Sequence, residues 1–318
     1  MGAECPLGGV KSREGERDRM SAVENYVSRQ AFEMAMAGYD AQLAAWPVPL
    51  LCRTVDTSLG ETFVLEFGDP AAPPLVLLHG SASNSGSWGF DAPAFAARFH
   101  CFAVDLPGET GRSTGFRPEY AGPTYTAWLS EVLDALGIES ARFCGLSLGG
   151  WVALRFAAAH PARVRALAVL APGGVVAARE SFTGAVDETL ASEEGMRKMA
   201  EAIFFPQPVP PGVAEMFVLM QSIYRTRRDD LPVIPEAELR AVTAPVLLLG
   251  GLQDALLDMK ATEAATSRMA AETAEQVLAK ADPQTLEEIA KLLHKVQKEG
   301  YDVAVGSRAA DGAEEGHK

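Results

Sequence analysis

The residues best suited to chemistry in this chain are those of the run Gly145-Leu146-Ser147-Leu148-Gly149. Apolar residues predict a strand just before the run, and a helix is predicted from Trp151 to Ala159. A serine at a sharp strand-to-helix turn is exposed and strained, and glycines must flank it because a Cβ there would clash with the backbone. The helix N-terminus also points N–H groups at whatever bonds to the serine. The pattern predicts a nucleophilic Ser147, and the alternative is an ordinary glycine-rich turn.

The elements around this turn alternate between strands and helices. Apolar residues at helical spacing run from Ala22 to Trp46, and prolines end that pattern. The predicted strands are 51–57, 61–67, 75–78, 101–104, 143–144, 164–170 and 245–250, and the predicted helices include 92–99 and 125–136. The first two strands read as a hairpin across residues 58–60. Alternation of this kind predicts right-handed crossovers and a mostly parallel sheet covered by helices on both faces.

The chain divides into five predicted segments. Residues 1–20 form a polar leader, 21–177 the first part of an α/β core, 178–239 a helical cap, 240–261 the remaining core strand and the loop after it, and 262–318 an atypical C-terminal segment. The cap segment is rich in methionine and phenylalanine, and most of these side chains must serve packing. A flexible surface of that kind also suits an apolar substrate.

Composition limits the partners of the protein. Its net charge is −14 over 318 residues and it has no basic block, which argues against nucleic acid and anionic membrane surfaces. No apolar run is long enough for a membrane span, and no secretion signal is visible, so a cytoplasmic location is expected. The cysteines lack metal-binding spacing. Cys101 and Cys144 are expected to flank a third strand ~10 Å apart, too far for a disulfide.

Four motifs in chain order resemble the α/β-hydrolase fold. They are Leu75–Gly80 followed by Ser81, Asp105-Leu106-Pro107-Gly108 with Gly111-Arg112-Ser113, the Ser147 turn, and Gly251-Leu252-Gln253-Asp254. Residues 39–261 are similar to small cytoplasmic bacterial carboxylesterases, which implies ester hydrolysis without a cofactor or metal. The resemblance also implies that the backbone N–H groups of Ser81 and Leu148 form an oxyanion hole.

The resemblance further implies an acid and a base beside the serine. Asp254 follows a buried strand at the carboxyl edge of the sheet, where it could hold a histidine in the correct tautomer. Asp258 is the alternative, and Asp254 could instead cap the next helix. Asp105 resembles a structural turn residue of the family and is a minor alternative acid. His79 is expected to anchor its loop rather than to take part in the chemistry.

Two histidines are candidates for the base, because no segment typical of the family follows Asp254 directly. His317 comes after a possible strand at 301–305 and a loop, in the order that the family requires, but the chain ends one residue later and such ends are usually mobile. His294 lies on the predicted polar face of an amphipathic helix and is expected at the surface. The candidates are therefore His317, His294 or neither.

A second resemblance concerns the C-terminal segment. Residues 281–308 look like a fragment of an inverting family-two glycosyltransferase, but the nucleotide-binding strands are missing and Asp282 is not part of a carboxylate pair for a metal. Sugar transfer is not expected, and the fragment would instead mark a fusion.

Three functions are compatible with these residues. The favoured one is a serine carboxylesterase that cleaves a small-molecule ester through an acyl-enzyme on Ser147, with Asp254 and His317. The second is another reaction of the same triad, such as that of a thioesterase, an acyltransferase or a C–C hydrolase. The third is an impaired hydrolase-fold protein that lacks its catalytic histidine. Neither the ester nor the oligomeric state follows from the sequence.

Overall fold

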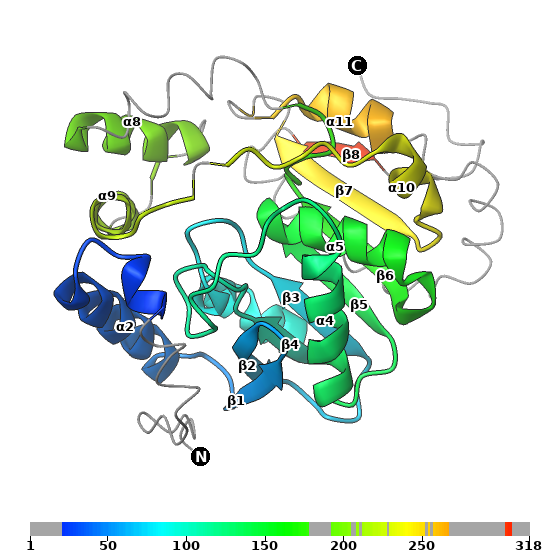
Figure 1. Cartoon of the computed structure of the whole chain (residues 1–318), viewed down its shortest axis with the longest axis horizontal. Helices are drawn as coiled ribbons and strands as arrows, with labels where there is room; N and C mark the ends of the chain where they lie inside the picture. Colours follow the sequence, from blue (N-terminus) through cyan, green and yellow to red (C-terminus); the bar gives the residue numbers. More distant parts are fainter. Residues whose placement is uncertain are drawn as a thin grey trace.

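A computed structural model describes residues 21–177, 192–204, 208–209, 212–227, 229–251, 254, 257–266 and 303–306 (Figure 1). Its centre is an eight-stranded sheet with the order β1-β2-β4-β3-β5-β6-β7-β8. The strands are β1 (Leu50–Thr57), β2 (Gly60–Phe67), β3 (Pro74–Leu78), β4 (His100–Val104), β5 (Ala141–Leu146), β6 (Val164–Leu170), β7 (Val246–Gly251) and β8 (Val303–Gly306).

The directions of the strands confirm the predicted α/β-hydrolase fold with its mostly parallel sheet. β4, β3, β5, β6 and β7 pair in parallel, each with its neighbour in the sheet. β1 and β2 form the predicted hairpin. Its turn, residues 58–59, lies between the paired residues Thr57 and Gly60. β2 is antiparallel to β4, and β8 is antiparallel to β7. Parallel strands end at one edge, so the loops that follow β3, β5, β6 and β7 gather there.

Two buried clusters cover the two faces of the sheet. Along β3, Val76 and Leu78 point into one cluster, while Leu75 and Leu77 point into the other. All four side chains are 5% exposed or less. Side chains alternate between the faces of a strand, so a strand that is apolar throughout must be covered on both sides.

Helices supply both coverings. The helical elements are α2 (Arg29–Ala44), η1 (Ser85–Phe90), α3 (Ala92–Ala96), α4 (Thr124–Ala135), α5 (Leu148–Ala159), η2 (Pro161–Arg163), α8 (Glu193–Phe204), α9 (Val213–Ile223), α10 (Glu236–Ala241) and α11 (Met259–Thr266). α4 and α5 lie across one face, where α10 packs on α5, and α2, η1 and α3 contribute to the other cluster (Figure 1). α8 and α9 lie together beside the sheet, and α9 also contacts α2.

The helix predicted from residues 22 to 46 is interrupted. α2 begins only at Arg29, where the hydroxyl of Ser28 accepts a hydrogen bond from the N–H of Ala31 at 3.1 Å. Just before it, Tyr26 forms an isolated β-bridge with Tyr224, almost 200 residues away. This tertiary pairing prevents helical geometry at Tyr26, although the local apolar spacing favours a helix.

The predicted placement of two cysteines is confirmed. Cys101 on β4 and Cys144 on β5 are buried and free, and β3 lies between their strands.

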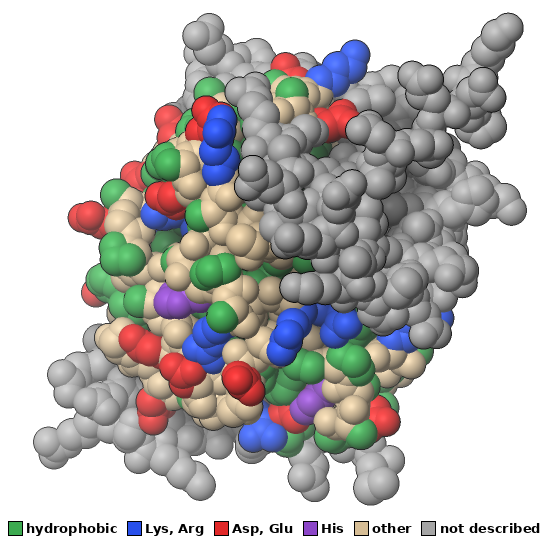
Figure 2. Space-filling view, turned by 90° about the vertical axis from the view of Figure 1, so that its right-hand side faces the viewer, with side chains coloured by type: hydrophobic (Ala, Val, Ile, Leu, Met, Phe, Trp, Pro, Cys, Tyr) green, Lys and Arg blue, Asp and Glu red, His purple; other side chains and the backbone are tan. Residues whose placement is uncertain are grey.

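On the part of the surface coloured in Figure 2, acidic and basic side chains are interspersed. Within the described ranges, no helix has the length and apolar character needed to cross a bilayer.

Candidate active site

Ser147 lies between the end of β5 and the first residue of α5, as predicted. Its backbone has a positive φ of 50°, with ψ of −110°, a conformation that residues with a side chain rarely adopt. A Cβ on Gly145 would lie 2.5 Å from the carbonyl oxygen of Gly149, so the turn closes too tightly for any side chain at residue 145. The N–H of Ser147 donates to the carbonyl of Leu170 at 2.9 Å, which fixes the turn against the end of β6.

Strained backbone gathers around this serine. Among the described residues, three that are not glycine have positive φ: Ala82, Ser147 and Ala171. They follow β3, β5 and β6, which are neighbours in the sheet, so the three lie at the same carboxyl edge. Each such conformation costs about 1–2 kcal/mol, and strain of this kind concentrates at functional sites. The strained residues therefore indicate that the candidate active site lies at this edge of the sheet.

The loop after β3 passes directly beside the serine. A Cβ built on Gly80 would lie 3.6 Å from the Cβ of Ser147, an ordinary van der Waals distance, so the side of Gly80 that lacks a side chain faces the serine. Ser81 follows and is exposed. Leu148 is the first residue of α5, and the N–H of a first helical residue has no acceptor inside its own helix. The two residues predicted for an oxyanion hole therefore flank Ser147 on two different elements.

His79 holds this loop and is not available as a base, in agreement with its predicted role as an anchor. The ring is fully buried, and its Nε2 accepts a hydrogen bond from the N–H of Leu106 at 2.9 Å. The proton must then be on Nδ1, which donates to the carbonyl of Gly80 at 2.8 Å. Burial lowers the pKa of His79, although Asp105 and the hydrogen bond to Gly80 act in the opposite direction. The ring is neutral, with both nitrogens committed to the backbone.

Asp105 is likewise occupied by structural contacts. Its Oδ1 accepts hydrogen bonds from the hydroxyl of Tyr39 at 3.0 Å and from the N–H of Ser85 at 2.7 Å. Its Oδ2 accepts the N–H of Arg112 at 2.7 Å. A Cβ on Gly111 would lie 2.2 Å from Oδ2, so glycine is required where the loop passes the carboxylate. This residue organises the loops after β3 and β4.

Asp254 lies just beyond β7, at the same edge as Ser147. The N–H of Ala171 donates to the carbonyl of Leu249 at 2.6 Å, so the ends of β6 and β7 are joined next to the serine. The N–H of Asp254 donates to the carbonyl of Gly251 at 3.0 Å, and its Oδ1 accepts the N–H of Leu257 at 2.9 Å. This last bond fixes the orientation of the carboxylate.

Asp258, the alternative acid, caps α11. Its Oδ1 accepts the N–H of Ala261 at 3.0 Å, and its carbonyl accepts the N–H of Thr262 at 2.8 Å. This is the geometry of an N-cap side chain that binds the N–H three residues later. The helix-capping role considered for Asp254 thus belongs to Asp258.

The two candidate bases, His317 and His294, lie outside the described residues. The strand expected near 301–305 exists as β8, but it runs antiparallel to β7: Val303 faces Gly251, and Gly306 faces Leu248. The chain therefore leaves β8 toward the edge opposite Ser147. Ten residues separate Gly306 from His317 in the sequence, and the eleven steps between their Cα atoms span at most ~40 Å when extended.

Glu109 is a buried residue near Ser147 that the sequence analysis did not single out. It is 7% exposed, and its Oε2 accepts the N–H of Ala82 at 2.6 Å. Burial raises its pKa to about 7, although the Ala82 N–H and the nearby Arg117 and Arg227 favour the charged form. A buried carboxylate in contact with the loop beside Ser147 was not foreseeable from local sequence.

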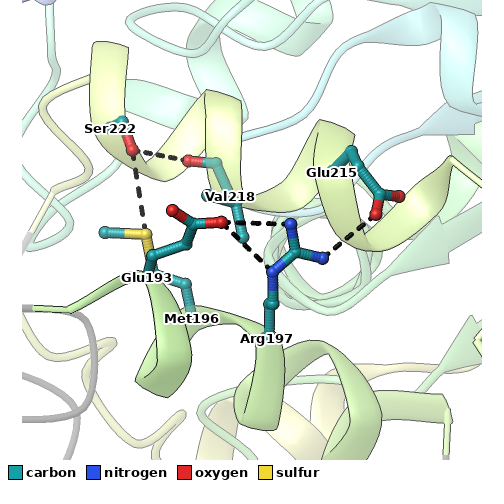
Figure 3. A network of polar contacts seen from close by, with 6 residues as sticks. All are labelled: Glu193, Met196, Arg197, Glu215, Val218 and Ser222. Atoms are coloured by element: carbon teal, nitrogen blue, oxygen red, sulfur yellow. Dashed lines mark hydrogen bonds and ion pairs between the residues drawn. The ribbon is translucent and has the colours of Figure 1, made fainter.

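Within the predicted cap at 178–239, α8 and α9 contact each other, whereas residues near its end pack against the core. Arg197 of α8 binds Glu215 of α9 at 3.0 Å and Glu193 of its own helix at 3.1 Å, so it ties the two helices together (Figure 3). The hydroxyl of Ser222 lies 3.8 Å from the sulfur of Met196 and adds a second contact between α8 and α9 (Figure 3). By contrast, Ile234 and Leu239 pack in the core cluster with α5. The division into cap and core segments stays a prediction.

Methionine and leucine side chains are exposed on α9. Met216 is 45% exposed and Leu219 is 38% exposed.

Within the described part of the chain, no three His, Cys, Asp or Glu side chains cluster closely enough to hold a metal ion.

The sequence matches known proteins over most of its length. The model of the "Alpha/beta hydrolase family" matches residues 75–291. An "Uncharacterized carboxylesterase nap" of Bacillus subtilis (strain 168) is 31% identical over 233 residues, which cover 69% of this chain and 76% of the relative. Carboxylesterase YbfK of the same organism is 29% identical over 230 residues, with the same shares of both chains.

Solved structures agree. Naproxen esterase (carboxylesterase NP) from Bacillus subtilis superposes with a TM-score of 0.65 and 28% identity, covering 74% of this chain and 86% of that chain. Carboxylesterase CesB (YbfK) gives 0.65 and 25%, with coverage of 76% and 88%. The family match extends into the segment that faintly resembles a glycosyltransferase, and none of the relatives named here supports that second resemblance.

Proposed function

Because this chain belongs to the alpha/beta hydrolase family and is a carboxylesterase-like hydrolase, we propose that it cleaves carboxylic esters through an acyl-enzyme intermediate on Ser147. The observation that carries the proposal is the positive φ of Ser147 at the carboxyl edge, with Gly80 facing it from one side and the N-terminus of α5 on the other. A hydroxyl in this position needs only a base to become a nucleophile.

In the proposed reaction the Ser147 oxygen attacks the ester carbonyl carbon, and its proton passes to a histidine. His317 is the proposed base. The carbonyl oxygen becomes an oxyanion, which accepts hydrogen bonds from the N–H groups of Ser81 and Leu148. A single donor of this kind contributes about 3–4 kcal/mol to the stability of the transition state. The histidinium then protonates the leaving alcohol, and the acyl group stays on Ser147.

Deacylation uses the same groups. Water takes the place of the alcohol, the histidine removes its proton, and a second tetrahedral intermediate collapses to the free acid and Ser147. Asp254 accepts the other ring N–H of the histidine and stabilises the imidazolium. Leu257 supports this role, because its N–H holds Oδ1 of Asp254 in one orientation.

The proposed substrates are esters with small or medium apolar acyl groups. The exposed Met216 and Leu219 of α9 support this class, since unbranched, flexible side chains adapt to apolar ligands of different shape. The carboxylesterase relatives favour ester hydrolysis over the thioesterase, acyltransferase and C–C hydrolase reactions that the same triad could perform.

Hydrolysis of p-nitrophenyl acetate and butyrate tests the proposal. The wild-type protein is expected to turn over both esters, with a pre-steady-state burst of p-nitrophenol equal to the enzyme concentration where deacylation is slow. Ser147→Ala is expected to lose at least about 10³-fold in kcat. A folded wild-type protein without turnover, or an unchanged Ser147→Ala variant, would contradict it.

A further inference from the structure

The loop that carries the predicted oxyanion donor contains a residue in an unfavourable conformation. Ala82 follows Ser81 directly and has a φ of 52°, in the left-handed region that alanine avoids. A residue stays in such a conformation only where its surroundings impose it. Its N–H donates to Oε2 of Glu109 at 2.6 Å, a short hydrogen bond to a carboxylate. Glu109 is therefore in direct contact with the strained position.

The turn that presents Glu109 is itself anchored by other parts of the chain. The hydroxyl of Tyr224 donates to the carbonyl of Gly108 at 2.6 Å, and the hydroxyl of Tyr26 donates to the carbonyl of Thr110 at 3.3 Å. Tyr26 and Tyr224 are joined in the β-bridge, with their rings 5.2 Å apart. The carbonyls on both sides of Glu109 are thus held by two buried tyrosines, so the carboxylate is presented from a fixed point.

Burial of this carboxylate calls for an explanation, because a buried charge is costly unless it has partners. Arg117 and Arg227 lie near enough to favour its charged form. The backbone N–H of Glu109 donates to the carbonyl of Leu106 at 3.3 Å, whereas its side chain accepts the Ala82 N–H at 2.6 Å. The carboxylate thus serves the loop beside Ser147.

We propose that Glu109 is a positioning residue for catalysis, which fixes the Gly80–Ala82 loop so that the Ser81 N–H is aimed at the oxygen of the tetrahedral intermediate. The proposal rests on the proposed function, since it assigns Glu109 to the oxyanion hole of that same site. Glu109 acts through Ala82 and does not touch the substrate. Its loss is expected to affect the transition state more than substrate binding.

Kinetics of two variants give the first test. In Glu109→Ala the hydrogen bond to Ala82 is lost, and kcat is expected to fall about 10- to 100-fold with KM changed by less than about 3-fold, since removal of a whole oxyanion donor costs about 10²- to 10³-fold. Glu109→Gln keeps an oxygen that accepts the Ala82 N–H, and it is expected to stay within about 5-fold of wild-type kcat. The exposed Glu119, ten residues further on, provides the matched control Glu119→Ala, which is expected to match wild type.

Hydrogen exchange gives a second test that needs no enzyme activity. The amides of residues 80–82 are expected to exchange at least about 10-fold faster in Glu109→Ala than in wild type, and to stay protected in Glu109→Gln and Glu119→Ala. An inactive wild-type protein that shows this exchange pattern would contradict the proposed function and support the positioning role. Unchanged exchange in Glu109→Ala, or equal losses in Glu109→Ala and Glu119→Ala, would overturn the positioning role whether or not esters are cleaved.

Discussion

A Cβ on Gly149 would lie 2.2 Å from the carbonyl oxygen of Leu78, the last residue of β3. The first turn of α5 therefore lies against the end of β3 with no room for a side chain, and this contact brings Ser147 next to the loop that carries Ser81.

Replacement of Gly149 by alanine should break this contact. Gly149→Ala is expected to lower the free energy of unfolding by about 1–3 kcal/mol, because backbone atoms on both sides must move apart, and to reduce esterase activity as Ser147 is displaced. Gly38, inside α2, is the matched control: an added Cβ would meet nothing within 4 Å. Gly38→Ala is expected to stabilise the protein by about 0.5–1 kcal/mol. Denaturant unfolding measures both, and equal effects of the two changes would contradict the account.

Two neighbouring aspartates allow the proposed acid to be separated from a structural residue. Asp254→Asn keeps an oxygen for the Leu257 N–H but cannot stabilise an imidazolium, so kcat is expected to fall about 10⁴-fold with little loss of stability. Asp258→Ala removes the cap of α11 and is expected to cost about 1 kcal/mol of stability while kcat is retained. Steady-state kinetics and thermal unfolding of both variants would show the opposite pattern if Asp258 were the acid.

The proposed base is tested by the two C-terminal histidines. His317→Ala is expected to lower kcat by about 10³-fold or more, whereas His294→Ala is expected to behave as wild type. Hydrolysis of p-nitrophenyl butyrate by the two variants, compared at the same pH, distinguishes them. A large loss in His294→Ala alone would reverse the assignment, and full activity in both would remove histidine from this part of the chain as the base.

Glu109 should make stability depend on pH. Burial raises its pKa from 4.5 to about 7, so the folded protein keeps a proton that the unfolded chain releases. The resulting stabilisation is complete below about pH 4.5 and is lost as the pH rises through about 7, by up to about 3 kcal/mol for a shift of this size. Glu109→Gln lacks this titration, so its free energy of unfolding should improve relative to wild type between pH 5 and pH 8. Parallel pH profiles from urea unfolding would refute the expectation.

Continuous apolar strands and the glycine pattern made the centre of the fold predictable. The hairpin of β1 and β2, the strand Val164–Leu170 and the turn at Ser147 all lie where local sequence places them, because each depends on residues close together in the chain. The start of α2 was not predictable, since the bridge between Tyr26 and Tyr224 that interrupts the helix joins distant segments.

The same reason explains what the sequence missed in the site. The contact of Glu109 with Ala82 spans 27 residues and crosses between two loops, so no local pattern reveals it. The direction of β8 depends on its pairing with β7, which the apolar residues of a short strand do not determine. Distant contacts set these features, whereas the turn at Ser147 was predictable from the pattern of five consecutive residues.

The central claim is that Ser147 is a working nucleophile, and intact-mass analysis after treatment with a fluorophosphonate tests it most directly. We expect a single adduct per wild-type chain, located on Ser147 by peptide mapping, and none on Ser147→Ala, because only a serine activated by a base reacts with this probe. No adduct on the folded wild-type protein, or an adduct that persists in Ser147→Ala, would contradict the account.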